Sequence, residues 1–317
     1  MDSFPYTIRP IEPEKDAEKI ARIIRISFRP WFDYDNIEYL NQLEHEGKKS
    51  LLHPLWTKLM GFPYNLDGVV CTDNEKITGV INTYPFYQNE QKCCLIANVC
   101  TASEYRNKGI ASHMILEVEN MQRKQGSYGL YLQARLETGG TVKMYKNRGF
   151  SVTDFRKTWI YPAKKQIQRD ASAEYRIGNI PKSEKPLMAE LFQARYPKSI
   201  LWNLDYKDEL FDDGLLTKIN RFLSLTPDRL QRIINPAGET KLWYVIQHLR
   251  DNLAQLWVVP NKSTTKTEMK QSLKTILSDW NGKKALKLDT PAVDADDIYQ
   301  TVGFTLQQTL AWMWKRL

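Results

Sequence analysis

The feature that most constrains the fold of this chain is a pattern that occurs twice. A segment of the form Tyr-x-x-x-Gly-Phe closes each half, at residues 145–150 and again at residues 299–304. In each half an alternating apolar strand precedes this segment, and a strand rich in β-forming residues follows it. Because internal similarity is the mark of repeated structural units, the sequence predicts two copies of one plan.

A second echo lies near the start of each half. Residues 6–11 read Tyr-Thr-Ile-Arg-Pro-Ile and residues 175–180 read Tyr-Arg-Ile-Gly-Asn-Ile, and a helical pattern follows each run. The stretch 163–172 is polar and lacks apolar periodicity, which is typical of a linker. The chain of 317 residues is long enough for two domains. We therefore expect an N-terminal domain over 1–162 and a C-terminal domain over 173–317.

The patterning of the first copy predicts a mixed α/β domain whose sheet begins with antiparallel strands and ends with helical crossovers. The fold class is therefore α/β, with an α+β type of mixed sheet. Strands are expected at 5–9, 67–72, 77–87, 93–101, 128–134 and 152–161, and helices from 16 to about 39 and over 41–60, 110–125 and 140–148.

Composition argues against several classes of protein. Hydrophobic residues make up 42% and charged residues 26%, which is unlike a disordered or fibrous chain. No apolar run approaches the roughly 20 residues of a membrane span, and the N-terminus lacks a secretory signal, so we expect a cytoplasmic protein without a membrane partner. The net charge of +8 is spread without a basic run and gives no reason to expect a nucleic-acid partner.

The cysteines do not have the spacing of a metal site. They form no Cys-x-x-Cys pair and share no neighbourhood with the histidines, so we expect no metal and interpret them as buried free thiols. They are Cys71, Cys93, Cys94 and Cys100.

The segment 98–111, which reads NVCTASEYRNKGIA, carries the most chemical information. It lies between an apolar strand and an amphipathic helix that Gly126 is placed to end. A loop entering a helix exposes backbone N–H groups at the positive end of the helix dipole, where an anion is favoured. Arg106 and Lys108 add positive charge, and Gly109 gives a phosphate room. The segment predicts an anion-binding loop, with a plain turn bearing solvated basic residues as the alternative.

Two motifs in the first half resemble a known family. The Arg-x-x-Gly-x-Ala run at 106–111, after a strand ending Val-x-Thr at 99–101, resembles the pyrophosphate-binding motif of the GNAT superfamily of acyl-CoA N-acetyltransferases. Residues 144–150 resemble the family's leucine-tyrosine-x-x-x-glycine-phenylalanine motif, and Arg135 stands where the family often has arginine. The element order over 5–161 is also similar, so the resemblance covers the whole first half. The chain is otherwise without the glycine-rich motifs of nucleotide triphosphate and dinucleotide sites.

The resemblance implies a role for each part of the site. Backbone amides of the loop would hold the pyrophosphate of coenzyme A, and the strand before it would pair with the pantetheine arm. The residues concerned are Arg106, Asn107, Lys108, Gly109, Ile110 and Ala111 for the pyrophosphate, and Val99, Cys100 and Thr101 for the pantetheine. The Val99 amide would polarise the thioester carbonyl, which is worth roughly 3 kcal/mol or more. Tyr145 would protonate the departing thiolate; its alternative is a tyrosine packed beside Phe150.

The sequence defines the remaining site residues less sharply. Glu104 is the carboxylate we take as the candidate base, with a solvated turn residue as the alternative, and Glu137 is placed in a similar way. Thr138 stands where the family frequently has an asparagine, which puts the usual cofactor contacts there in doubt. Trp31, Phe32 and Tyr84 are the candidate substrate residues, because aromatic faces near carboxylates suit a cationic amine. Packing is their alternative role.

The second copy lacks the anion-binding loop. Its strand over 256–259 is followed by Pro260, and no Arg-x-x-Gly-x-Ala run leads into the next helix. Proline removes an N–H donor, and without the glycine the backbone has less room for pyrophosphate. We expect a degenerate copy that shapes the substrate cleft or a dimer interface, which leaves a homodimer open. Tyr299 is then expected to be structural.

Three functions from different classes fit these patterns. The leading hypothesis is an N-acetyltransferase that moves an acetyl group from acetyl-CoA to a primary amine of a small molecule or peptide by direct attack on the thioester. A second is a non-catalytic regulator that binds acyl-CoA. A third is a tandem transferase that uses aminoacyl-tRNA, although such enzymes are not expected to keep a complete pyrophosphate loop.

Overall fold

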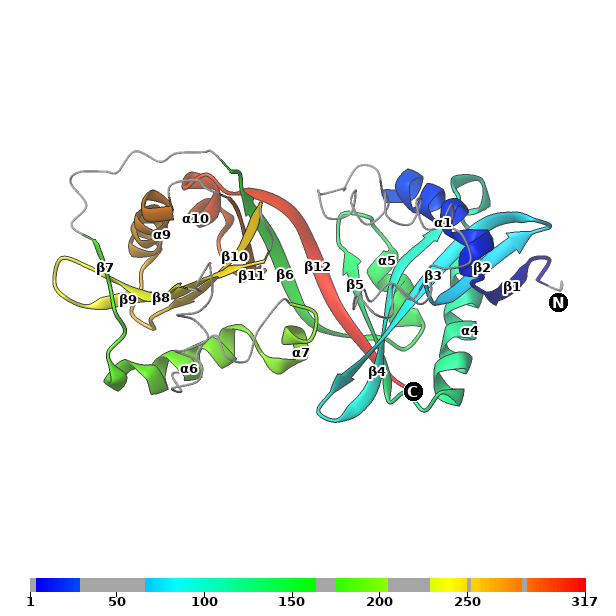
Figure 1. Ribbon diagram of the computed structural model, residues 1–317, viewed down its shortest axis with the longest axis horizontal. Coiled ribbons are helices and arrows are strands. Elements are labelled where there is room, and N and C mark those ends of the chain that lie inside the picture. The colour runs from blue at the N-terminus through cyan, green and yellow to red at the C-terminus, as the bar shows by residue number, and fades with distance from the viewer. Residues whose placement is uncertain (1–3, 29–65, 164–174, 205–228, 250–251, 281–283) are drawn as a thin grey trace. The chain divides into compact units, whose positions relative to one another are not determined.

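The chain folds into two compact units, each described by itself. The computed structural model describes residues 4–28, 66–163, 175–204, 229–249, 252–280 and 284–317 (Figure 1). Unit 1 comprises Met1–Ala134, Gly140–Val152 and Met313–Leu317, and unit 2 comprises Arg135–Gly139 and Thr153–Trp312. Residues 153–161, which end the first copy in sequence, thus belong to unit 2, and the end of the chain belongs to unit 1. Nearly all of the expected linker 163–172 lies outside the described residues.

The sheet of unit 1 has the strand order β1-β2-β3-β4-β5 and then the last residues of β12. Its strands are β1 (Thr7–Pro10), β2 (Gly68–Asp73), β3 (Lys76–Gln88), β4 (Gln91–Thr101), β5 (Gly129–Arg135) and the end of β12 (Thr305–Arg316). Strands β1 to β4 pair antiparallel, whereas β4 and β5 pair parallel. The helices are α1 (Pro13–Phe28), α4 (Ile110–Lys124) and α5 (Thr141–Asn147). The mixed α/β class and the element order are confirmed, while the helix expected at 41–60 lies outside the described residues.

Helices α1 and α4 cover opposite faces of this sheet. Ile20 and Ile24 of α1 pack in one buried cluster with Val80 of β3. A Cβ atom on the neighbouring Gly79 would instead lie 2.7 Å from Cε of Met114 on α4. Because successive residues of a strand face opposite sides, the two helices lie on different faces. Glycine at position 79 therefore leaves room on this face of β3 for the side chains of Met114 and Ile110 on α4.

Helix α4 has a left-handed glycine at each end. Gly109 precedes its first residue with φ of 76°, and Gly126 follows its last turn with φ of 73°. The N–H groups of Gly126 and Ser127 donate to carbonyls of the last turn, at 3.1 and 2.9 Å. Only glycine adopts this conformation without a steric cost, so the predicted helix end at Gly126 is confirmed.

The sheet of unit 2 has the strand order β12-β6-β11-β10-β9-β8-β7. Besides β12, its strands are β6 (Ser151–Tyr161), β7 (Arg176–Gly178), β8 (Arg229–Ile234), β9 (Thr240–His248), β10 (Leu253–Pro260) and β11 (Ala285–Pro291). The helices α9 (Lys266–Trp280) and α10 (Asp296–Thr301) cover one face, and α6 (Lys185–Arg195) and α7 (Lys198–Leu201) cover the other (Figure 1). Alternate residues of β9 feed the two cores: Tyr244 and Ile246 face α9, and Trp243 and Val245 face α6.

Three further expectations concern residue types. The four cysteines are buried and unpaired, which confirms their interpretation as free thiols. Within the described residues, no cluster of His, Cys, Asp and Glu is arranged to hold a metal ion. No helix in the same part of the chain is long and apolar enough to cross a membrane.

Candidate active site

Strands β4 and β5 diverge and leave part of β4 with an open edge. They pair only where residues 93–95 meet residues 129–131, although β4 continues to Thr101. Among the described residues, the edge of β4 over 96–101 therefore has no pairing with β5. Such an edge offers backbone N–H and C=O groups to an extended ligand. The residues expected to contact pantetheine, 99–101, lie on this edge.

A β-bulge lies at the same place. Two residues of β4, Asn98 and Val99, face one residue of β3, Ile81, where the register between the strands shifts. Asn98 has φ of 52°, a left-handed conformation that asparagine tolerates better than most residues. A bulge redirects the groups beside it, so the main chain at Val99 departs from the regular ladder. Sequence analysis missed this bulge; its one signal is a polar asparagine within an apolar strand.

The loop after β4 presents consecutive unpaired N–H groups. A short 3₁₀ turn, Ser103–Tyr105, leads to the loop, and the N–H of Arg106 donates to the carbonyl of Ser103. The N–H of His113 donates to the carbonyl of Gly109 at 3.1 Å. Between these bonds, the N–H groups of 107–112 have no acceptor in the part of the chain that the structure describes, and no side chain caps α4. Open donors together with the helix dipole favour an anion at such a position.

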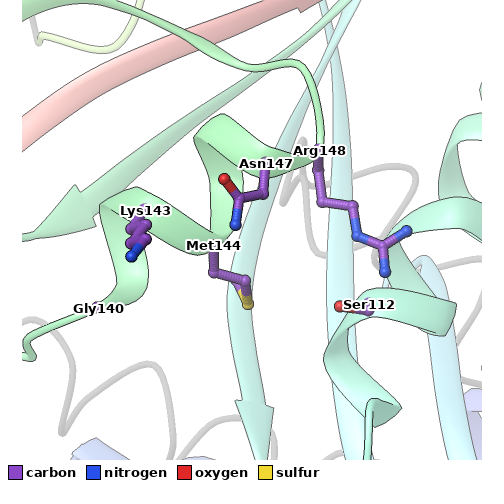
Figure 2. A pocket seen from close by; sticks show the side chains of 6 residues that line it. All are labelled: Ser112, Gly140, Lys143, Met144, Asn147 and Arg148. Atoms are coloured by element: carbon purple, nitrogen blue, oxygen red, sulfur yellow. The ribbon is translucent and has the colours of Figure 1, made fainter.

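A basic pocket adjoins this helix start. It has a volume of about 460 Å³ and lies between the first turn of α4 and helix α5 (Figure 2). Its lining residues are Ser112, Gly140, Lys143, Met144, Asn147 and Arg148. Figure 2 shows Arg148 extending from the end of α5 toward Ser112 on α4. Two cations and no carboxylate line the pocket, so it attracts a second anionic group close to the loop.

Tyr145 lies on α5 and its side chain is only 4% exposed. Its ring packs edge-to-face against Phe150 with centroids 5.7 Å apart. This contact is the one expected if the tyrosine has a packing role. Its hydroxyl has no hydrogen-bond partner among the described residues, which leaves it available to a ligand. Burial, and to a smaller extent the nearby Cys100 thiol, raises the pKa of the phenol, so it stays protonated at neutral pH. The electrostatic effect of Cys100 on this phenol indicates that Tyr145 of α5 lies near β4.

Glu104 does not have the properties of a general base. It is exposed on the 3₁₀ turn and accepts hydrogen bonds from Lys76 at 2.9 Å and from the Ser103 hydroxyl at 3.0 Å. The bond from Lys76 is the main cause that lowers the pKa of Glu104 to about 2. A carboxylate with so low a pKa accepts a proton poorly at neutral pH. We therefore correct the catalytic role expected for Glu104: it fastens the turn to β3.

Other expected site residues lie in different places. Thr138 donates to the carbonyl of Arg135 at 2.8 Å, within a segment that belongs to unit 2. Glu137 accepts the N–H of Thr309 at 2.7 Å. Tyr84 is half-buried on β3 opposite Leu95, the residue after which β4 and β5 diverge. The expected substrate residues Trp31 and Phe32 lie outside the described residues.

In unit 2 a side chain of the protein fills the space between the corresponding strands, β10 and β11. Strands β9 and β10 pair without a shift in register, so β10 has no bulge over its paired length. The parallel pairing of β10 with β11 ends at Leu256 and Leu288. Beyond it, the buried hydroxyl of Tyr196 lies 3.4 Å from both the N–H and the carbonyl of Val258, and it donates to the carbonyl of Asp289 at 3.2 Å. The space between these strands thus contains a tyrosine of the protein itself.

The helix start of unit 2 is closed as well. Thr265 and Glu268 form a reciprocal capping box at the start of α9, with bonds of 2.8 and 3.3 Å. Lys241 contacts the same carboxylate at 2.9 Å. A side-chain anion therefore lies at this helix start, where the loop before α4 has open donors. Tyr299 is buried and bonds to Asp294 and Arg195, as expected of a structural residue.

An open strand edge with a bulge, leading through an uncapped donor loop into a helix, defines unit 1 as an acyltransferase-type α/β fold. In agreement, residues 21–150 match the sequence model of the acetyltransferase (GNAT) family, and this part of the chain is a GNAT acetyltransferase domain. A comparison with curated protein sequences finds no match.

Solved structures share the fold over nearly the whole chain. A GCN5-related N-acetyltransferase from Sphaerobacter thermophilus is 11% identical, with 98% of this chain and 96% of that chain covered and a TM-score of 0.56. A GCN5-related glucosamine N-acetyltransferase region of a fungal multi-domain β-N-acetylglucosaminidase is 13% identical, with coverage of 98% and 38% and a TM-score of 0.51. A tandem GNAT protein from the clavulanic acid biosynthesis pathway is 10% identical, with 98% of each chain covered and a TM-score of 0.49.

Proposed function

We propose that this protein is an N-acetyltransferase that transfers the acetyl group of acetyl-CoA to a primary amine, and that its chemistry takes place in unit 1. The observation that carries the proposal is the run of unpaired N–H groups at residues 107–112, next to the open edge of β4. A diphosphate fits the first feature, and an extended amide-containing arm fits the second. The GNAT domain over residues 21–150 supports the same reaction class.

The residues of unit 1 fit coenzyme A. The amides of 107–112 would hold its diphosphate, with Arg106 and Lys108 adding positive charge. Lys143 and Arg148 in the adjoining pocket would attract a further phosphate of the nucleotide. The open edge of β4 would pair with the pantetheine arm. When bound, acetyl-CoA supplies the activated thioester.

The proposed reaction needs two further groups from the protein. The amine attacks the thioester carbon, so that a C–N bond forms and the C–S bond breaks. The main-chain N–H at Val99 would stabilise the negative charge on the carbonyl oxygen, and Tyr145 would donate its proton to the departing thiolate. The proton that the amine nitrogen loses goes to solvent, from which the Tyr145 phenolate regains one. The acceptor is proposed to be a small-molecule or peptide amine that reacts in its neutral form.

Unit 2 is proposed to bind no cofactor. Tyr196 lies between its diverging strands, and Glu268 with Thr265 closes its helix start. Both parts of the acyl-CoA site are thus already satisfied by the protein's own groups. The complete loop in unit 1 also argues against the tandem transferases that use aminoacyl-tRNA.

The test compares two glycines with the same backbone conformation at the two ends of α4. Gly109→Glu places a carboxylate among the loop donors, whereas Gly126→Glu places one at the other end of the helix, where a Cβ meets no atom within 4 Å. Both substitutions carry a similar backbone strain of about 1 kcal/mol. We expect Gly109→Glu to lower acetyl-CoA affinity at least 100-fold by titration calorimetry, an electrostatic loss of about 2.7 kcal/mol, and Gly126→Glu to leave it unchanged.

Thiol release then tests turnover against a panel of amines, aminoglycosides and peptides. Release by the wild type and by Gly126→Glu, but not by Gly109→Glu, is the expected result. Binding without release across the panel would favour a non-catalytic acyl-CoA-binding protein. If acetyl-CoA did not bind the wild type, or bound Gly109→Glu equally well, the site assignment would be wrong.

A further inference from the structure

The bulge in β4 is held by a pair of side chains, one half-buried and one fully buried. Nδ2 of Asn98 donates to Oδ1 of Asn82 at 3.0 Å, across from β4 to β3. Asn82 is completely buried, and Asn98 is the residue of the bulge with φ of 52°. The side chain of Asn98 therefore ties its own strained backbone to the neighbouring strand, at the residue that immediately precedes Val99.

The pair is supported from a third strand. Nδ2 of Asn82 lies 3.5 Å from the carbonyl of Asp67, which also accepts the N–H of Thr83 at 2.9 Å. At Gly68, a Cβ atom would lie 2.0 Å from the carbonyl oxygen of Ile81, the residue opposite the bulge. Polar links and close backbone packing thus join β2, β3 and β4 around one point. These contacts hold the bulge in its conformation without a ligand.

Packing alone does not account for this arrangement. A hydrogen bond between two amides contributes little net stability compared with apolar side chains of the same volume, and the buried amide of Asn82 is costly if it loses its partner. Asn74 and Asn89 also have positive φ, but they lie in the turns between strands, where asparagine is common. Asn98 differs because it lies inside a strand. Backbone conformations that cost free energy locally are found where a functional site needs a defined geometry.

We propose that Asn98 and Asn82 are positioning residues that aim the main-chain donor at Val99 toward the thioester carbonyl. This inference rests on the proposed function. A donor stabilises the developing oxyanion only if its direction is fixed in advance, because reorganisation during the reaction would cost the same free energy that the bond supplies. In this proposal the pair acts through the bulge and not through contact with the cofactor or the acceptor.

The test measures carbonyl polarisation directly. Asn98→Gly keeps the left-handed backbone accessible but removes the link to Asn82, and Asn98→Asp keeps the side-chain shape but removes the Nδ2 donor. Acetyl-CoA labelled with ¹³C at the carbonyl is bound to the full chain, and its C=O stretch is measured by isotope-edited infrared spectroscopy. Asn74→Gly is the matched control, since Asn74 has φ of 53° in a turn between β2 and β3.

We expect the wild type and Asn74→Gly to lower the carbonyl frequency relative to free acetyl-CoA. Asn98→Gly and Asn98→Asp should lose most of that shift while binding coenzyme A, which has no acyl carbonyl, within about twofold of the wild type. With an acceptor from the panel, kcat should fall at least tenfold with little change in KM, less than the ~10²–10³ of a deleted oxyanion donor.

The outcomes separate this inference from the proposed function. A full carbonyl shift in both Asn98 variants would overturn the positioning role and leave the acetyltransferase proposal standing. Loss of coenzyme A binding in both variants would show a general structural role and would also overturn it. Failure of the wild type to bind acetyl-CoA would overturn both. Asn82→Asp, which keeps an acceptor for Asn98, should retain more of the shift than Asn82→Ala.

Discussion

The phenol of Tyr145 is held in its protonated form by its surroundings. Burial disfavours the phenolate and raises the pKa above the ordinary value near 10. The folded state therefore binds this proton more tightly than the unfolded chain does. Its contribution to stability is present below pH ~10 and is lost as the pH rises through the raised pKa. Between neutral pH and pH ~10, the tyrosine remains a proton donor.

This residue gives a prediction for catalysis. Tyr145→Phe should lower kcat roughly 100-fold, at the low end of general acid effects, with acetyl-CoA affinity unchanged. The rate of the wild type should show no loss from ionisation of Tyr145 below pH ~10, because its pKa is raised. Thiol-release rates across pH for both proteins measure these effects. Tyr128→Phe, at a tyrosine outside the site in the same unit, is the control, and equal rates for Tyr145→Phe and wild type would refute the acid role.

At the scale of elements, two helix starts of similar position carry opposite chemistry. Helix α4 begins at a glycine without a side-chain cap, and its first donors are open. Helix α9 begins with the capping box of Thr265 and Glu268. The N–H of Thr265 is the main cause that lowers the pKa of Glu268, with Lys241 next. A helix start without a cap lacks a stabilising hydrogen bond but leaves its N–H groups open to a ligand. A capped helix start gains stability and has no open donors at those positions.

The capped helix start predicts an effect confined to stability. Thr265→Ala should destabilise the protein by about 1 kcal/mol in urea unfolding and leave acetyl-CoA affinity unchanged. Because the pKa of Glu268 is lowered on folding, its contribution is present above its ordinary pKa and fades as the pH falls through the lowered value. Because Thr265→Ala keeps the backbone N–H and Lys241, the variant should lose nearly as much stability on acidification as the wild type. Thr275→Ala, inside the same helix, should be nearly neutral; a similar loss there would contradict a specific cap.

Across the whole molecule, the end of the chain completes the unit that contains the site. Lys315 forms an ion pair with Glu119 of α4 at 2.6 Å. Trp314 packs against Tyr128 and Tyr131 beside β5, with ring centroids 6.4 and 6.1 Å apart. The N–H of Leu317 donates to the carbonyl of Tyr128 at 3.0 Å. Unit 1 therefore depends on residues that lie far along the chain from the rest of it.

Removing this C-terminal support should affect the distant N-terminal part of the sequence. Trp314→Ala should destabilise unit 1 by about 2–4 kcal/mol, because a large aromatic contact is lost. Deletion of residues 313–317 should have a larger effect and weaken acetyl-CoA binding. Thermal unfolding with and without acetyl-CoA measures both. Val293→Ala, at a side chain that is 92% exposed, is the control. Unchanged unfolding of the deletion variant would contradict the assignment of these residues to unit 1.

The sequence by itself determined the helices and strands, the two copies and the donor loop. Apolar periodicity, glycine positions and turn residues act over a few neighbouring residues, so they can be recognised without a structure. The loop at 106–111 was identified in this way, whereas Tyr145 was identified from the resemblance to the family's motif.

Only the tertiary structure decided the features that depend on distant neighbours. The bulge at Asn98 is defined by the register with β3, and Glu104 loses its expected role because Lys76 lies beside it. Tyr196 enters the space between strands of unit 2 from a separate helix. Most of β6 belongs to unit 2, and residues 313–317 at the end of the chain belong to unit 1. No local pattern encodes these contacts, because register and side-chain partners are set when segments remote in sequence pack together.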